Sequence, residues 1–320
     1  MRSNRRQRTE NMQSKIVVRL SLTLLYTLIL TAAWAQPASI DFGVAYYDVG
    51  QLYDTFQSQD YNDKHFTEQG SMRWDRQRYQ RKIEHTVRVI DSMALPVMIL
   101  YGVENKQVVR DLVALSKRDY AYIHRDQNIN NGLEFAVLYE ADKFTPETIT
   151  TWDRALCVEG RVKGSNNGSD KSNKSDKSDK SYNEGNAEMG VKELPIAVIA
   201  SAGCTSIGVL MRERGLDAKS DNIILIGQPS KTNFEQLGLR DATLAAEQAG
   251  RGNAVKSGRW VMLHKAATSI AARATCEAYA KNWLLDDSRK PLDTFSRKRY
   301  RGGYSASLPI YIYFEDLFAY

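Results

Sequence analysis

The stretch WDRQRYQRKIEHTVRVIDSMALPVMILY, residues 74–101, decides the class of the fold. Its first part has apolar side chains at spacings of three and four residues, which predicts an amphipathic helix with one buried stripe. The stripe consists of Tyr79, Ile83, Val87, Ile90 and Ala94. The closing run, VMILY, is apolar and of strand length. A helix next to a buried strand predicts an α/β layer in which helices pack on a sheet.

The sequence on both sides of this stretch continues the alternation. IDFGVAYY (Ile40–Tyr47) precedes it as a strand, and QVVRDLVALSKRD and EFAVLY (Glu134–Tyr139) follow as a helix and a buried strand. In the second half, IGVLMRERGLD is helical, NIILIG is a buried strand, NFEQLGLRDATLAAEQAG is mostly helical, and LPIYIYF is the last strand. Two strand-rich halves with outer helices predict a β-sandwich flanked by helices.

A polar segment interrupts the middle of the chain. ALCVEGRVKG (Ala155–Gly164) and VKELPIAVIAS (Val191–Ser201) read as two strands that face each other. Between them lies SNNGSDKSNKSDKSDKSYNEGN, a Ser/Lys/Asp/Asn repeat that cannot bury enough apolar surface to offset the entropy lost on ordering. We interpret residues 164–187 as a disordered insertion at a hairpin tip. A charged arm that binds a partner is the alternative, and the nearly balanced charges favour a solvated insertion.

The N-terminus has the three parts of a secretory leader. Lys15 and Arg19 precede the apolar run LSLTLLYTLILTAA, and AWA follows it, so residues 1–35 are predicted to be a signal peptide. The run is too short for a comfortable membrane span, although an uncleaved anchor is the alternative. Met12 is a second possible start. The protein is therefore expected to be exported, to the periplasm or beyond, and to keep no stable span after cleavage.

Removal of the leader changes the charge balance. The leader holds six of the 44 Lys and Arg residues and one of the 38 Asp and Glu residues, so residues 36–320 have a net charge near +1. A net charge this close to zero does not predict the excess of positive charge that is typical of nucleic-acid-binding proteins. The partner is expected to be an undefined ligand or protein. Residues 36–320 are long enough for a single domain with a well-buried core, expected to be monomeric.

Cysteine and histidine patterns exclude two common kinds of site. Cys157, Cys204 and Cys276 are widely spaced and form no disulfide framework, although one pair could form in an exported chain. No two of them have metal-ligand spacing, and the four histidines show no H-x-x-x-H arrangement, so a zinc site is not predicted. A nucleophilic pair of Cys204 and His264 has no support beyond the residue types.

Several short motifs, in order along the chain, resemble those of bacterial secreted members of the endonuclease/exonuclease/phosphatase superfamily. YDVGQLYDT (Tyr47–Thr55) resembles their Tyr-Asn-Val-Glu-Asn-Leu-Phe-Asp-Thr start, and YGVEN (Tyr101–Asn105) resembles Ala-Glu-Val-Glu-Asn. GLEFAVLY resembles Gly-Ile-Asp-Val-Ala-Leu-Leu-Tyr. The intervening family segment with Phe-Thr, Gly, Trp, Tyr and Lys is matched by Phe66, Thr67, Gly70, Trp74, Tyr79 and Lys82. The resemblance implies a four-layered α/β-sandwich, with two packed β-sheets flanked by helices.

The resemblance also implies where catalytic groups should lie. The family uses Mg²⁺ held by carboxylate and amide oxygens, and a His with an Asp partner that supports attack by water on a phosphate. Carried over residue by residue, most of these positions have lost the required group. The Asn of the first motif becomes Asp48, and the metal-binding Glu becomes Gly102. The His of a His-Trp-Pro-Ser motif falls near Ser201, where there is no His.

The remaining catalytic positions of the family also lack the required groups in this chain. Gly-Asp-Phe-Asn-Asp falls on GQPSK, so that Asp becomes Gln228 and Asn becomes Ser230, and a later Asp becomes His264. The Asp-His pair of Ser-Asp-His-Leu-Pro becomes Ala306 and Ser307 within RGGYSASLPIYIYF. The resemblance therefore implies a protein that has lost hydrolase activity and needs no cofactor.

An active enzyme with a rearranged site is the alternative. Gly102 and Glu104 are two residues apart, so on a regular strand they would face the same side. With Asp48 and Glu134, Glu104 could form a residual acidic cluster for Mg²⁺ and support a phosphodiesterase or nuclease. The family itself has acidic residues at the positions of Glu104 and Glu134, so their presence does not establish compensation.

Overall fold

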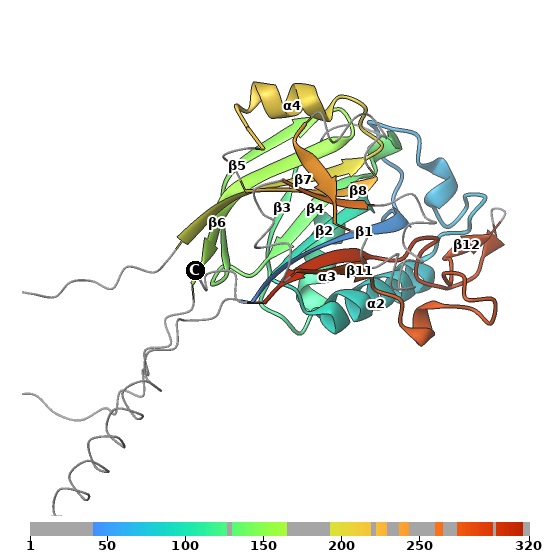
Figure 1. Ribbon diagram of the computed structural model, residues 1–320. Coiled ribbons are helices and arrows are strands. Elements are labelled where there is room, and N and C mark those ends of the chain that lie inside the picture. Colours follow the sequence, from blue (N-terminus) through green and yellow to red (C-terminus); the bar gives the residue numbers. More distant parts are fainter. Residues whose placement is uncertain are drawn as a thin grey trace, which may run out of the picture.

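The computed structural model describes residues 41–126, 130–164, 193–218, 222–228, 237–242, 260–264, 274–296 and 299–315. The predicted leader, Ser230 and residues 165–187 of the predicted insertion lie outside these ranges. Figure 1 shows the described chain folded into two β-sheets with helices against them.

The first sheet is six-stranded and mixed, in the order β11-β14-β1-β2-β4-β3. β1 pairs in parallel with β2 and antiparallel with β14, so the N-terminal and C-terminal strands lie side by side at its centre. β1 and β2 are almost continuously apolar and are buried on both faces, whereas β14 alternates between buried and half-buried residues. The bounds are β1 (Phe42–Leu52), β2 (Val97–Val103), β3 (Ala121–His124), β4 (Glu134–Tyr139), β11 (Ala274–Ala278) and β14 (Ile310–Phe314).

The second sheet is also six-stranded and mixed, in the order β5-β6-β7-β8-β10-β9. β6 and β7 are antiparallel, with Lys163 opposite Glu193, so the two strands predicted to face each other do so. One prediction is wrong here: Leu239–Asp241 was expected in a helix, yet it pairs with β10 as strand β9. The bounds are β5 (Phe144–Trp152), β6 (Ala155–Lys163), β7 (Glu193–Ala202), β8 (Ile223–Gln228), β9 (Leu239–Asp241) and β10 (Trp260–His264).

Helix boundaries follow from local capping. α2 (Arg76–Met93) begins after Asp75, whose side chain accepts a hydrogen bond from the backbone N–H of Arg78. The helix ends at Ala94, which has a left-handed φ of 52°. α3 (Lys106–Leu115) begins after Asn105, whose side chain accepts from two backbone N–H groups. The predicted stripe is confirmed at four of its five residues, since Ile83, Val87 and Ile90 are buried and Tyr79 packs against the core, whereas Ala94 is exposed and lies just past the helix.

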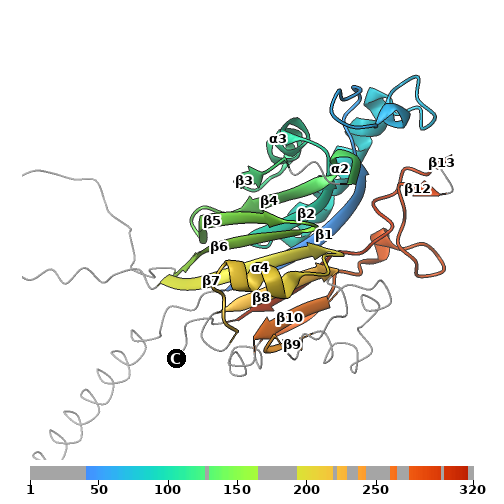
Figure 2. The same ribbon diagram turned by 90° about the horizontal axis from the view of Figure 1, so that it is seen from above.

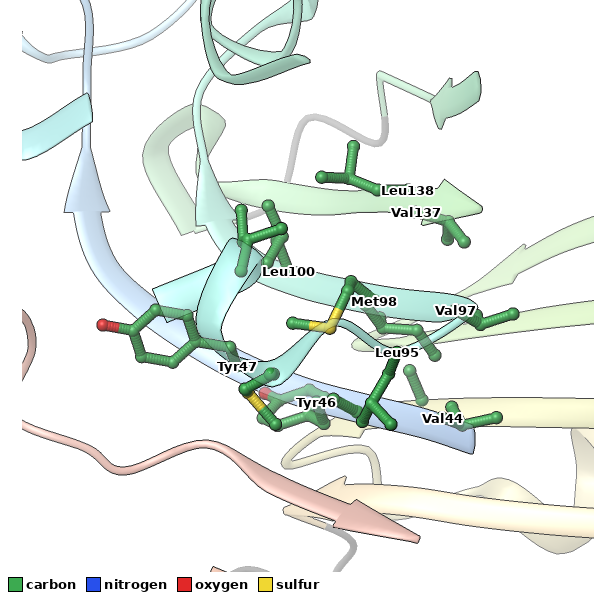
Figure 3. Close-up of a cluster of buried hydrophobic side chains, with 14 of the residues drawn as sticks. Val44, Tyr46, Tyr47, Leu95, Val97, Met98, Leu100, Val137 and Leu138 are labelled. Atoms are coloured by element: carbon green, nitrogen blue, oxygen red, sulfur yellow. The ribbon is translucent and has the colours of Figure 1, made fainter. Parts of the chain in front are cut away.

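Apolar side chains fill the space between the layers. Figure 3 shows part of this core, in which Tyr46 and Val44 of β1 and Met98 of β2 lie among aliphatic side chains. α4 (Ile207–Glu213) covers the outer face of the second sheet through Ile207, Leu210 and Met211. In Figure 1, α4 lies on one side of the two sheets and α2 and α3 lie on the other. The predicted sandwich of two packed sheets flanked by helices is confirmed.

Loops gather at the end of the sandwich toward which β1 points (Figures 1 and 2). The segment after β1 carries the short helix η1 (Lys64–Phe66), and the segment before β14 carries η5 (Asn282–Leu284), β12 (Phe295–Ser296) and β13 (Arg299–Tyr300). Phe66 and Phe295 meet edge to face across these two segments. A third short helix, η2 (Asn130–Gly132), precedes β4. The candidate site lies at this end.

Candidate functional site

The end of β1 is tied to the loop that precedes β14. The hydroxyl of Ser305 donates a hydrogen bond to the backbone oxygen of Asp48 over 2.6 Å. The side chain of Asp48 makes a hydrogen bond within its own strand, in which its Oδ1 accepts from the backbone N–H of Gly50 at 2.9 Å. The structure thus brings the predicted positions at Asp48 and at Ala306–Ser307 to the same end of the fold.

Ala306 lines a cavity of about 430 Å³ at this end. Its lining combines aromatic and polar groups from the two loop segments and the end of β1. The lining residues are Gly50, Gln51, His65, Phe66, Ser71, Met72, Asp293, Thr294, Phe295 and Ala306. At the rim, Nδ1 of His65 lies 2.9 Å from the hydroxyl of Ser71. Neighbouring Ser307 donates its backbone N–H to the hydroxyl of Ser305. The sequence predicted Ala306 at this place but not His65, Ser71 or Asp293.

Gly102 cannot carry a side chain in this backbone. Its φ is +91°, in the region that favours glycine, and a Cβ atom there would overlap the carbonyl oxygen of Gly50. The strands shift register here, between Asp48 and Leu52 of β1 and between Tyr101 and Val103 of β2. The expectation that Gly102 and Glu104 face the same side of one regular strand is therefore wrong, because a bulge separates them and β2 ends at Val103.

Glu104 lies beneath the loop that follows β1. One carboxylate oxygen accepts from the backbone N–H of Asp54 at 2.6 Å, and the other accepts from the hydroxyl of Tyr61 at 2.9 Å. The residue is 3% exposed. Burial raises the pKa of Glu104 to about 8, and the nearby carboxylates of Asp54 and Asp63 add to this, while its two hydrogen bonds oppose it. A buried carboxyl group whose two oxygens both accept hydrogen bonds is poorly placed to bind a cation.

Lys82 lies under the same end of the fold. Its Nζ donates to the backbone oxygen of Val49 at 2.6 Å, to the hydroxyl of Thr294 at 2.7 Å and to the backbone oxygen of Tyr304. The residue is 1% exposed. Burial lowers the pKa of Lys82 to about 7, against the opposing charges of Asp293 and Asp48. Lys82 matched the family motif in sequence, but its spacing gave no sign that it joins three segments.

The second sheet holds the other predicted positions. Ser201 of β7 is fully buried, and its hydroxyl accepts from the backbone N–H of Cys204 at 3.1 Å, so it supports the turn before α4. Gln228 is the exposed last residue of β8. His264 is the last residue of β10, and the structure describes its backbone only. Ser230 lies outside the described residues.

The proposed residual acidic cluster is not assembled as a trio. Within the described ranges, the only group of three or more His, Cys, Asp or Glu side chains with ligand atoms within 4.8 Å of one another is His124, Asp126 and Glu134. Glu134 therefore lies with His124 and Asp126, and Asp48 and Glu104 do not complete a group with it. The sequence does carry a signal for this group, because His124, Asp126 and Glu134 lie close together along the chain, but H-x-x-x-H spacing does not describe one histidine with two carboxylates.

The three cysteines, Cys157, Cys204 and Cys276, are all buried, and none of them forms a disulfide in the described part of the chain. Burial raises the pKa of the Cys157 thiol to about 12, which keeps it protonated and unreactive. No helix in the described part of the chain is long and apolar enough to cross a membrane.

Comparison with known proteins supports the family resemblance for the first part of the chain. Residues 43–163, from β1 to β6, match the model of the Endonuclease/Exonuclease/phosphatase family. That span contains Asp48, Gly102, Glu104 and Glu134, whereas Ser201, Gln228, Ala306 and Ser307 lie beyond it. No curated protein matches the chain.

Several solved structures are similar to this chain at low sequence identity. An endonuclease/exonuclease/phosphatase from Bacteroides vulgatus is similar with a TM-score of 0.47 and 9% identity, covering 86% of this chain and 98% of that one. A Bacteroides thetaiotaomicron family protein gives 0.44 and 13%, covering 88% and 99%. A humanized D. rerio TDP2 gives 0.46 and 11%, covering 86% and 98%.

Proposed function

We propose that this chain is an exported protein of the endonuclease/exonuclease/phosphatase type that has lost hydrolase activity and uses its cleft to bind a ligand or a protein partner. The observation that carries the proposal is the backbone at Gly102. The position at which the resemblance expects the metal-binding Glu is occupied by the carbonyl oxygen of Gly50. A neighbouring acidic residue could replace a lost carboxylate. At Gly102, however, the backbone of Gly50 fills the space that the Cβ atom of a metal-binding Glu would need.

The cavity at Ala306 supports binding without phosphate chemistry. Its described lining includes neither Lys nor Arg, and its acidic group is Asp293. A phosphodiester is an anion, and enzymes that cleave one place cations or a metal ion around it. A carboxylate and two phenyl rings, from Phe66 and Phe295, are better suited to a neutral or cationic organic molecule that stacks on a ring and donates a hydrogen bond.

Loss of the Asp-His pair supports the same conclusion. By the resemblance, Ala306 and Ser307 stand where the family has the groups that assist attack by water. Neither side chain can act as a general base near neutral pH. Removal of a set of catalytic groups that act together leaves little activity beyond that due to binding.

The test is hydrolysis by the full chain. Purified protein would be assayed for cleavage of plasmid DNA and of a simple phosphodiester with Mg²⁺ or Mn²⁺, beside the double variant Asp48→Ala/Glu104→Ala. We expect no metal-dependent turnover by either protein and no shift of the melting temperature with Mg²⁺. Robust turnover that is lost in a folded double variant would overturn the proposal and favour an active phosphodiesterase with a rearranged site.

Export and assembly belong to the same proposal. The leader sequence supports secretion through the inner membrane, and the nearly neutral remainder gives no electrostatic support for binding to nucleic acid. A monomeric state is part of the proposal. Cell fractionation with and without residues 1–35 tests the first point. Protein found in the cytoplasm with an intact N-terminus would contradict export.

A further inference from the structure

His124 lies at an unusual place for a histidine that serves packing alone. It is the last residue of β3, the edge strand of the first sheet, and only 2% of its side chain is exposed. Its Nε2 is buried and has no hydrogen-bond partner among the described residues. A buried imidazole nitrogen without a hydrogen-bond partner destabilises the fold by its desolvation cost, and such nitrogens are rare unless they serve a bound ion, a water molecule or a reaction.

Carboxylates face both nitrogens of this ring. Oδ1 of Asp126 lies 3.7 Å from Nδ1, and Oε2 of Glu134 lies 4.0 Å from Nε2. Both distances exceed a hydrogen bond. One ligand atom from each of the three residues lies within 4.8 Å of the other two. The three ligand atoms are therefore close to one another without a direct hydrogen bond between the ring and either carboxylate.

We propose that His124, Asp126 and Glu134 form a binding site for a divalent transition-metal ion of the zinc class. One imidazole nitrogen and two carboxylate oxygens are a donor set that suits Zn²⁺, Mn²⁺ or Fe²⁺, with water in the remaining positions. Mg²⁺ prefers oxygen ligands alone and is the poorer fit. Ligand atoms around such an ion lie roughly 3–3.5 Å apart for bonds of about 2.0–2.2 Å, so the site must close slightly.

The local charges suit a cation. Burial lowers the pKa of His124, despite the opposing effect of Asp126, which leaves the imidazole neutral and able to ligate near neutral pH. The two carboxylates can balance the charge of a divalent ion. The positive charge of Lys106 lowers the pKa of His124 further, in the same direction as burial. Glu134 is 2% exposed and Asp126 is 89% exposed at the side chain, so an ion would enter from the side of Asp126.

This site shares one position, Glu134, with those that the hydrolase resemblance identifies. None of Asp48, Gly102, Ala306 or Ser307 takes part in it. A protein that has lost phosphodiesterase activity could still bind an ion here, for stability or for a partner. Failure of one proposal therefore leaves the other intact.

The test is metal binding by the full chain after treatment with a chelator. Zn²⁺ would be titrated by calorimetry, and Co²⁺ would be followed by its visible absorption, which reports coordination number and nitrogen ligation. We expect one ion per chain, a Co²⁺ spectrum typical of four or five ligands, and at least tenfold weaker binding in Asp126→Asn and Glu134→Gln. Mg²⁺ should compete poorly.

Controls separate this site from adventitious binding. Asp142→Asn removes an exposed carboxylate elsewhere and should leave the affinity unchanged. Because Asp126 is mostly exposed, Asp126→Asn should fold normally even if substitutions at His124 or Glu134 do not. Affinities that are equal in wild type, Asp126→Asn and Asp142→Asn would overturn the proposal. So would the absence of stoichiometric binding at millimolar Zn²⁺ or Co²⁺.

Discussion

Nζ of Lys82 lies 2.6 Å from the backbone oxygen of Val49, so that the side-chain amine of a residue in α2 is hydrogen-bonded to strand β1 near its end. The same nitrogen donates to Thr294 and Tyr304, which belong to the segment before β14. Three parts of the chain far apart in sequence therefore depend on one buried amine.

Lys82→Met should destabilise the protein by about 2–4 kcal/mol at pH 9, because buried acceptors lose their donor. The difference in unfolding free energy between wild type and Lys82→Met should fall by about 2 kcal/mol as the pH is lowered from 9 to 7. The folded pKa is about 7 and the unfolded value about 10.5, so between them the unfolded chain binds more protons and stability rises with pH. Urea unfolding at pH 7, 8 and 9 measures this. Lys117→Met, at an exposed position, is the control and should show no trend. If the stability difference between wild type and Lys82→Met did not change with pH, the three acceptors would be keeping the ammonium group of Lys82 charged in the folded protein.

Glu104→Gln should show the opposite pH dependence. The pKa of Glu104 is about 8 when folded, above its ordinary 4.5, so the folded state holds the proton between these values and wild-type stability falls as pH rises. The variant should therefore gain about 2–4 kcal/mol relative to wild type from pH 5 to pH 8. Denaturation at several pH values tests this, with the exposed Glu84→Gln as control. Parallel pH profiles for wild type and Glu104→Gln would contradict it.

Gly102→Ala should cost more than about 3 kcal/mol of unfolding free energy, because the methyl group would meet the carbonyl oxygen of Gly50 in addition to the strain of a positive φ. Gly215→Ala is the matched control. Gly215 also has a positive φ, +65°, but nothing lies within 4 Å of the added atom. Its cost should stay near 1 kcal/mol. Equal costs in thermal or chemical unfolding would show that the backbone at Gly102 moves aside easily.

Deletion of residues 165–186 should leave the melting temperature nearly unchanged. The strands that flank this segment are already paired up to Lys163 and Glu193, and shortening the connection changes the loop-closure entropy by only about 1 kcal/mol. Differential scanning calorimetry of both chains tests the point. A drop of many degrees would mean that the insertion packs on the fold.

Local patterns were sufficient for most of the architecture. The stripe in residues 79–94 predicted α2 because its buried side, at Ile83, Val87 and Ile90, repeats with the helical period. The apolar runs in β2 and β4 predicted buried strands for the same kind of reason. The pattern was less informative at Leu239–Asp241, where pairing with β10 outweighed an intrinsic preference for helix.

The periodicity of apolar residues was enough to predict the layers and the facing strands around the insertion. The residues at the expected catalytic positions came from the motifs of the family resemblance. The fold was needed to show that Gly50 closes the space at Gly102, that Tyr61 and Asp54 cover Glu104, and that Glu134 meets His124 rather than Asp48. The first two relations arise from a register shift and from segments that meet across long sequence separations, which no local spacing encodes, and the third arises from the pairing of β3 with β4.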